Sequence, residues 1–428
     1  MYQIDFKKPM HIHFIGIGGI SMSGLASILL KQHFKVSGSD AHESELTKQL
    51  EAEGAILYYG QRASNLDDTP DLVVYTAAIH PDNPEYAAAV AKQIPMLSRA
   101  ELLGQMMHNF KTPVAISGTH GKTTTTSMAS YIFLEADMDP TISVGGILDA
   151  IGGNIRVGGH DTFLTEACEY TNSFLHFFPK ISVILNIDAD HLDFFKDLDD
   201  IRHSFRKFAQ LLPDDGTLIV NSEIEHLDQL TEGLTCKIVT YGMDASSDYY
   251  ASNITFDEFA HPSFDCYKGD TLLGHFVLHV PGIHNVSNAL ASIALADQMG
   301  VSMEQIKDMV DVNTVIGDAV QTQDGSTIIP ISRVSFGFVA GGGEYAVSGA
   351  QAGAYGLPFA GGAGAGVSIH PMGFLVCGRN GVRLLSAGSA SPMERVAELI
   401  PQALENWKRL GDEQENAKPS PVRAAYQE

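Results

Sequence analysis

The sequence predicts an α/β protein with two nucleotide-binding units and a following β-rich, glycine-rich module. Short apolar strands alternate with helical stretches, a glycine turn follows the first strand, and Gly-Lys-Thr-Thr follows a later one. The expected organisation is a Rossmann-like domain over residues 1–108, a central P-loop domain with a parallel sheet over 109–307, a β-rich module over 308–410 and a polar tail over 411–428.

Composition limits the class of partner. A hydrophobic fraction of 44% and a charged fraction of 18% over 428 residues are typical of a globular protein with two or three domains. The net charge of −24 argues against nucleic acid as a partner, because phosphate neutralisation needs clustered Lys and Arg. A nucleotide ligand stays compatible with it, since one lysine, a helix N-terminus and a metal ion suffice. The 4 cysteines are isolated, which favours free thiols and a cytoplasmic location.

The apolar run over residues 12–30 has two interpretations. Basic residues precede it, as in a signal peptide, but it contains four glycines and three serines and has a strand–turn–helix rhythm. That rhythm favours a nucleotide-binding unit. Since no other run is long enough to cross a bilayer, stable membrane insertion is not expected.

The first unit carries an approximate dinucleotide fingerprint. A strand over His11–Ile15 leads into a turn containing Gly16 and Gly18, and a second strand ends at Asp40. Ser21 stands where the fingerprint has its third glycine. The pattern indicates a diphosphate at a helix N-terminus and leaves the kind of nucleotide open.

The strongest chemical signal is a glycine-rich loop between the strand Pro113–Ser117 and a helix. Glycines let backbone N–H groups face a phosphate, Lys122 supplies a compact cation, and the Thr123 hydroxyl can reach Mg²⁺. Ile116 replaces the first glycine of the full motif, so an ordinary turn before a helix is the alternative. The loop comprises Gly118, Thr119, His120, Gly121, Lys122, Thr123 and Thr124.

Two further strands end in potential metal ligands. Glu166 and Glu169 follow the strand that begins at Thr162, and His191 lies in an acidic stretch after the strand Ile181–Asn186. Carboxyl ends of neighbouring parallel strands meet at one edge, so these groups are expected beside the glycine loop. Solvated side chains are the alternative for each.

These passages in this order resemble the Mur ligases, most closely their alanine-adding type, over about residues 8–305. The matching segments are residues 13–19, 37–40, 118–126, 166–170, 190–193 and 281–289.

The resemblance implies a ligase that uses ATP and Mg²⁺ to join L-alanine to UDP-N-acetylmuramate in peptidoglycan precursor synthesis. It implies catalytic roles for Lys122, Glu166 and His191, and metal binding by Thr123, Glu166 and His191. It also implies adenine contacts from His284 and Asn288, and a UDP-sugar site with Gly16, Gly18, Asp40, His80 and Arg99.

The resemblance ends near Lys307, where Mur ligases continue into a third domain. Residues from Met309 to about Arg409 instead resemble the GerW-type sporulation protein family, with no assigned catalysis and no identified partner. Strands are expected at Thr327–Ile331, Val334–Val339 and Phe374–Cys377, with Gly361–Gly366 as a surface loop and a closing helix over Pro392–Trp407. Two alternatives to a ligase therefore stay open: a protein that binds UDP-muramate or ATP without joining anything, and an inactive chimera.

Overall fold

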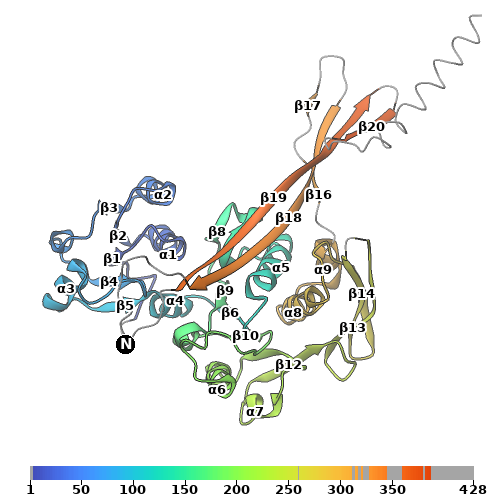
Figure 1. Cartoon of the computed structure of the whole chain (residues 1–428), viewed down its shortest axis with the longest axis horizontal. Coiled ribbons are helices and arrows are strands. Elements are labelled where there is room, and N and C mark those ends of the chain that lie inside the picture. The colour runs from blue at the N-terminus through green and yellow to red at the C-terminus, as the bar shows by residue number, and fades with distance from the viewer. Residues whose placement is uncertain are drawn as a thin grey trace, which may run out of the picture. The chain divides into compact units, whose positions relative to one another are not determined.

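A computed structural model describes residues 3–258, 260–310, 314–316, 320–321, 327–344, 359–378 and 381–386 (Figure 1). Contacts divide the chain into two units, Met1–Val312 and Asn313–Glu428, each described here by itself. The predicted closing helix and polar tail lie outside the described residues.

The N-terminal part of the first unit is a five-stranded parallel sheet in the order β3-β2-β1-β4-β5. The order changes direction between β1 and β4, where open α/β sheets bind ligands, and the predicted Rossmann-like fold is confirmed. The strands are β1 His11–Ile15, β2 Lys35–Asp40, β3 Ile56–Tyr59, β4 Leu72–Tyr75 and β5 Met96–Ser98. The helices are α1 Ile20–Lys31, α2 Glu45–Glu53, η1 Ala63–Leu66, α3 Pro84–Ala91 and α4 Arg99–Met107.

The second sheet has ten strands in the order β15-β14-β13-β12-β11-β10-β6-β9-β7-β8. The seven strands from β13 to β7 are parallel, which confirms the predicted parallel sheet, and antiparallel strands flank both edges. The strands are β6 Thr112–Ser117, β7 Thr141–Leu148, β8 Gly153–Arg156, β9 Thr162–Ala167, β10 Ile181–Ile184, β11 Thr217–Asn221, β12 Lys237–Gly242, β13 Tyr249–Phe256, β14 Pro262–Lys268 and β15 Thr271–Val277.

Helices cover both faces of this sheet and contribute to separate hydrophobic clusters. Phe133 of α5 and Leu290 of α8 belong to one cluster, and Phe205 of α6 and Leu230 of α7 belong to the other. The helices are α5 Lys122–Glu135, η2 Asp149–Ile151, η3 Tyr170–His176, α6 Leu198–Ala209, α7 Leu227–Thr231, α8 His284–Gln298 and α9 Met303–Val310.

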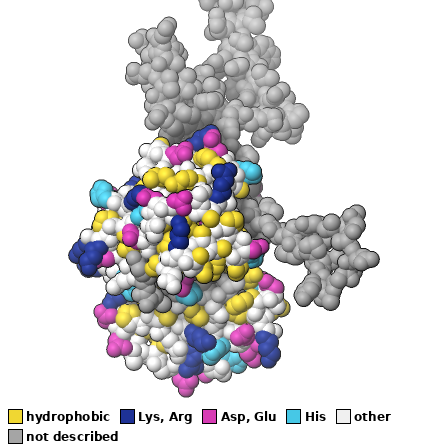
Figure 2. All heavy atoms as spheres, turned by 90° about the vertical axis from the view of Figure 1, so that its left-hand side faces the viewer, with side chains coloured by type: hydrophobic (Ala, Val, Ile, Leu, Met, Phe, Trp, Pro, Cys, Tyr) yellow, Lys and Arg dark blue, Asp and Glu magenta, His cyan; other side chains and the backbone are white. Residues whose placement is uncertain are grey.

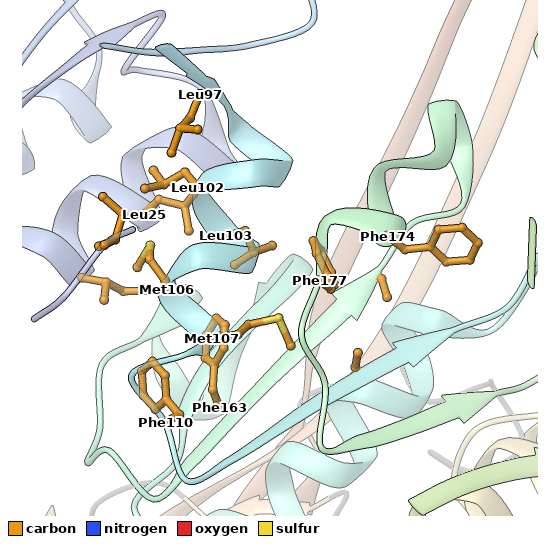
Figure 3. Close-up of a cluster of buried hydrophobic side chains, with 14 of the residues drawn as sticks. Leu25, Leu97, Leu102, Leu103, Met106, Met107, Phe110, Phe163, Phe174 and Phe177 are labelled. Carbon is orange, nitrogen blue, oxygen red and sulfur yellow. The ribbon is translucent and has the colours of Figure 1, made fainter. Parts of the chain in front are cut away.

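Helix α4 joins the two sheets through one continuous core (Figure 3). Leu102 and Met106 share this core with Leu25 of α1, while Met107 and the following Phe110 lie near Phe163 of β9 (Figure 3). The rings of Phe110 and Phe163 stack with centroids 4.8 Å apart. A side chain on Gly104 of α4 would collide with the backbone carbonyl of His176 in η3, so glycine permits this close approach.

Phe163→Ala is expected to lower the free energy of unfolding of the whole chain by about 3–5 kcal/mol, because it removes a fully buried ring and leaves a cavity. Chemical denaturation followed by circular dichroism measures the change. Val90→Ala is the control, since Val90 is 58% exposed on α3 and a surface change of this kind costs roughly 0.5 kcal/mol or less. Equal effects of the two substitutions would contradict the shared core.

The second unit contains an antiparallel sheet in the order β16-β18-β19-β20, with β17 paired to β18. Its strands are β16 Thr314–Ile316, β17 Val320–Gln321, β18 Thr327–Glu344, β19 Phe359–Gly378 and β20 Gly381–Ser386. The expected β-rich module is confirmed, but Gly361–Gly366 is not a surface loop. It lies within β19 and pairs with residues 337–342 of β18, so backbone pairing keeps these glycines extended.

The first unit has a mixed surface. Figure 2 shows basic and acidic side chains interspersed with apolar ones on the face turned to the viewer. Within the described part of the chain, helices long and apolar enough to span a membrane are absent.

Candidate active site

The glycine loop lies at the carboxyl edge of the second sheet, between β6 and α5. Gly118 and Gly121 have φ values of 147° and 84°, in the region that favours glycine. Strand β6 is hydrogen-bonded to β10 on one side and β9 on the other. The three passages singled out in the sequence therefore follow adjacent strands, with the glycine loop in the middle.

Lys122 is the first residue of α5 and folds back over the loop. Its Nζ donates to the carbonyl oxygens of Gly118 at 2.5 Å and Thr119 at 3.1 Å. It also donates to the Glu169 carboxylate, whose Oε2 lies 3.0 Å away. Glu169 is 1% exposed. The lysine is thus preorganised above the loop by a buried counter-charge, which limits the cost of burying either group alone.

Glu166 is held by hydrogen bonds from α5 and from β7. Its Oε2 accepts the Thr123 hydroxyl at 3.0 Å, and its Oε1 accepts the backbone N–H of Gly145 in β7 at 2.6 Å. Burial raises the pKa of Glu166, while these two hydrogen bonds and the charge of Lys122 oppose the shift. A methyl group on Gly145 would lie 2.8 Å from Glu166 Oε2, so the carboxylate rests directly on a glycine.

The hydroxyl and carboxylate of Thr123 and Glu166 fit one hard cation. Mg²⁺ prefers oxygen ligands and keeps waters and phosphate oxygens in its shell, so two protein oxygens are sufficient. In the described ranges no three His, Cys, Asp or Glu side chains gather into a metal-binding group. The third predicted metal ligand, His191, lies beside Glu169, with Nε2 3.8 Å from Oε1.

The segment after β10 is fastened to the glycine loop. The Asn186 side chain accepts the His120 N–H at 2.7 Å and donates to the His120 carbonyl at 3.0 Å. The Thr119 hydroxyl accepts the N–H of Asp188 at 2.9 Å. These hydrogen bonds fix the position of the glycine loop relative to the segment after β10, which also carries His191.

His191 has a left-handed backbone with φ 53°, a conformation that costs energy in a residue other than glycine. Tyr170 contacts it from the β9 side: the two rings have centroids 4.7 Å apart, and the Tyr170 hydroxyl donates to Asp193 Oδ2 at 2.8 Å. Thr171 and Asn172 are also left-handed. Left-handed backbone outside glycine therefore occurs both in the segment that follows Glu169 and at His191, which lies beside it.

Helix α8 brings Asn288 to the loop, with His284 at its first residue. Asn288 is 6% exposed and donates from Nδ2 to Asn285 Oδ1 at 3.0 Å. A methyl group on Gly121 would lie 2.6 Å from Asn288 Oδ1. His284 is exposed. Of the two residues expected to contact adenine, Asn288 thus lies against the loop backbone and His284 faces solvent.

The glycine turn of the first sheet is built around Asp40. Gly16 has φ 83°, and the Gly18 N–H donates to Asp40 Oδ2 at 2.8 Å. His80 is exposed in the segment after β4. Arg99 begins α4, where burial lowers its pKa and its charge interacts with Cys168. Cys168 directly precedes Glu169, so Arg99 lies near the segment that follows β9.

Comparison with known proteins identifies the class. Residues 11–111 match the model "Mur ligase family, catalytic domain", and residues 116–296 match "Mur ligase middle domain". Residues 320–405 match "Sporulation protein YtfJ", in agreement with the sporulation-family resemblance. The chain belongs to the Mur ligase family, whose members are ATP-dependent ligases.

The curated relatives are of the alanine-adding type. The UDP-N-acetylmuramate–L-alanine ligase of Agathobacter rectalis is 58% identical over 73% of this chain and 68% of its own length. That of Lachnospira eligens is 56% identical over 72% and 67%. Among solved structures, the UDP-N-acetylmuramate–alanine ligase of Thermotoga maritima has a TM-score of 0.60 at 31% identity, covering 71% of this chain and 68% of that one.

Two parts of the site were missed by sequence reasoning. Gly145 acts through its backbone N–H, and nothing in its residue type signals that it faces Glu166. Asn186 carried a usable signal, because a polar amide directly after an apolar strand at the same edge is placed to bond a neighbouring loop.

Proposed function

We propose that this chain joins L-alanine to UDP-N-acetylmuramate with ATP, as a step of peptidoglycan precursor synthesis in the cytoplasm. The observation that carries the proposal is the adjacency of Lys122, Glu169 and His191 with the Thr123–Glu166 pair at one sheet edge. High identity to alanine-adding relatives supports the choice of substrates. Cys168, Cys236 and Cys266 are free thiols, which is consistent with a reducing compartment.

The reaction has two steps. A carboxylate oxygen of the muramoyl group attacks the γ-phosphorus of ATP, the bond to the β-phosphate oxygen breaks, and ADP leaves. The alanine amine then attacks the acyl carbon, inorganic phosphate leaves, and the nitrogen loses a proton as the amide forms. Both steps depend on positioning and on neutralising phosphate charge, which is the work of the glycine loop.

Lys122 would hold the γ-phosphate oxygens after exchanging its loop carbonyl contacts for them. The backbone N–H groups from Gly118 to Thr124 would orient the phosphates at the α5 N-terminus. Thr123 and Glu166 would hold one Mg²⁺, and His191 would contribute to a second. When bound, the metal supplies charge neutralisation on the phosphates.

The remaining predicted residues would divide between two ligands. His284, the exposed first residue of α8, would contact adenine, with Asn288 keeping Gly121 in place. Gly16, Gly18 and Asp40 would bind the UDP portion at the turn after β1, with His80 at its rim. Arg99 would carry positive charge towards the muramoyl end. The second unit is given no catalytic role.

A purified-chain assay tests the proposal. ADP release is measured with ATP, Mg²⁺ and UDP-N-acetylmuramate, with and without L-alanine. Alanine-dependent release together with a new amide product, detected by mass spectrometry, is the expected result. Binding of either nucleotide without turnover would replace the ligase by the binding-protein alternative, and absence of both would favour the inactive chimera.

Gly121→Ala is expected to raise the KM for ATP about tenfold or more. A left-handed backbone costs a residue with a Cβ about 1–2 kcal/mol, and here the added methyl also meets the buried Asn288 amide. Gly152→Ala is the matched control: its φ is 64°, but nothing lies within 4 Å of the added methyl. If both variants keep the wild-type KM, Gly121 does not shape the ATP site.

A further inference from the structure

A cluster of buried polar side chains lies beneath the glycine turn of the first sheet, and the proposed function does not use it. We call it the Glu85 cluster; its members are His13, Ser37, Ser39, Asn65 and Glu85, with exposures between 0% and 9%.

The Glu85 carboxylate is the centre of this cluster. It is 0% exposed, and it accepts the Ser39 hydroxyl at 2.5 Å and the Asn65 amide at 2.5 Å. His13 Nε2 lies 3.7 Å from Glu85 Oε1 and has no hydrogen-bond partner, while its Nδ1 bonds the Ser37 hydroxyl at 2.9 Å. Donors from β2 and η1 therefore converge on one carboxylate at the start of α3, and the His13 ring of β1 lies beside it.

Stability alone is a weak reason for such a cluster. Burying a carboxylate is costly, and apolar replacements of similar volume are often as stable. The position of Glu85 in the first turn of α3, after the Asn83 cap, favours an acid through the helix dipole. The dipole explains a negative charge at this helix end, but not why two other elements, β2 and η1, direct donors to it.

The cluster is connected to the glycine turn by backbone hydrogen bonds. The Ser39 carbonyl accepts the N–H groups of Gly16 at 2.8 Å and Ile17 at 3.0 Å. Asn65 also donates to the Gly60 carbonyl at 3.0 Å, and the Gly60 N–H donates to the Asp40 carbonyl at 2.8 Å. Glu85 thus holds Ser39, whose carbonyl bonds the glycine turn, and Asn65, which bonds the Gly60 segment next to Asp40.

We propose that Glu85 is a positioning residue for the sugar-nucleotide site: by anchoring Ser39 and Asn65, it sets the Gly16–Gly18 turn and Asp40 in the geometry that accepts a nucleoside diphosphate. This inference rests on the proposed function only in assigning the UDP-sugar to the first sheet. Glu85 itself is buried and does not touch the ligand.

Calorimetric titration of the full chain with UDP-N-acetylmuramate tests the inference without requiring turnover. Glu85→Gln keeps the shape of the side chain but replaces one carboxylate oxygen by an NH₂ group. That group then faces the donor of Ser39 or of Asn65. We expect the Kd for the UDP-sugar to rise about tenfold or more, since a charge-assisted hydrogen bond is lost and the turn loosens. The Kd for ATP, which binds the second sheet, should stay unchanged. Glu51→Gln, at an exposed residue of α2, is the control.

Ser39→Ala provides a second variant that leaves the carboxylate in place. Its Kd for the UDP-sugar should also rise. The double variant should bind the UDP-sugar no more weakly than Glu85→Gln alone, because both substitutions act through the Ser39–Glu85 hydrogen bond. Unchanged UDP-sugar affinity in both variants, or equal losses of ATP and UDP-sugar affinity, would overturn the inference. A wild-type chain that does not bind the UDP-sugar would instead overturn the proposed function.

Discussion

Replacing Lys122 by alanine is expected to lower alanine-dependent ADP release by about 10²–10³-fold or more, because a preorganised cation at the transferring phosphoryl group is lost. The change should appear mainly in kcat, since the loop N–H groups still bind ATP. It should also leave Glu169 buried without its partner, so the free energy of unfolding should fall as well.

Two variants separate these effects. Lys122→Ala/Glu169→Gln removes the unpaired charge and should recover part of the stability while staying inactive. Lys207→Ala, an exposed lysine on α6, should behave as wild type in both measurements. Undiminished ADP release in Lys122→Ala would refute the assignment of the glycine loop to ATP.

Glu166→Gln is expected to have the second largest effect on activity. It keeps the size of the side chain and its capacity to accept from Gly145, but it removes the charge that would hold Mg²⁺. The Mg²⁺ concentration for half-maximal ADP release should rise about tenfold or more, since even substitution of residues that only orient a metal's ligands costs about 10–100-fold in affinity.

Because burial raises the pKa of Glu166 and the amide cannot ionise, the substitution also removes an unfavourable buried charge at neutral pH. The variant should therefore be at least as stable as the wild type, which distinguishes it from a folding defect. Glu135→Gln, exposed at the end of α5, serves as the control. A wild-type Mg²⁺ requirement in Glu166→Gln would remove this residue from the proposed metal site.

The sequence predicts the parts of the site that depend on local pattern. Strand β1 has the predicted bounds, and the glycine loop follows its strand as expected. The convergence of Glu166, Glu169 and the His191 segment on this loop was also predicted, because strands that end at one edge carry their following residues there.

Non-local features could not be predicted. The order β10-β6-β9-β7 depends on pairing between distant segments, so Gly145 could not be placed beside Glu166. Nor could the left-handed backbone of His191, which the surrounding contacts impose against its own preference. In the second unit, glycine-rich composition favoured a loop, but pairing with residues 337–342 of β18 keeps Gly361–Gly366 extended.

Helix α4 has a consequence for how this protein could be recombined with its relatives. By position in the chain it closes the first sheet, yet Gly104 touches η3 and Met107 shares a core with Phe163. A crossover placed between the two sheets would therefore separate α4 from its packing partners in η3 and β9. A segment exchanged between members of this family would have to end before Arg99 or include η3 and β9 as well. The two sheets therefore could not be exchanged as independent units, because α4 packs against both.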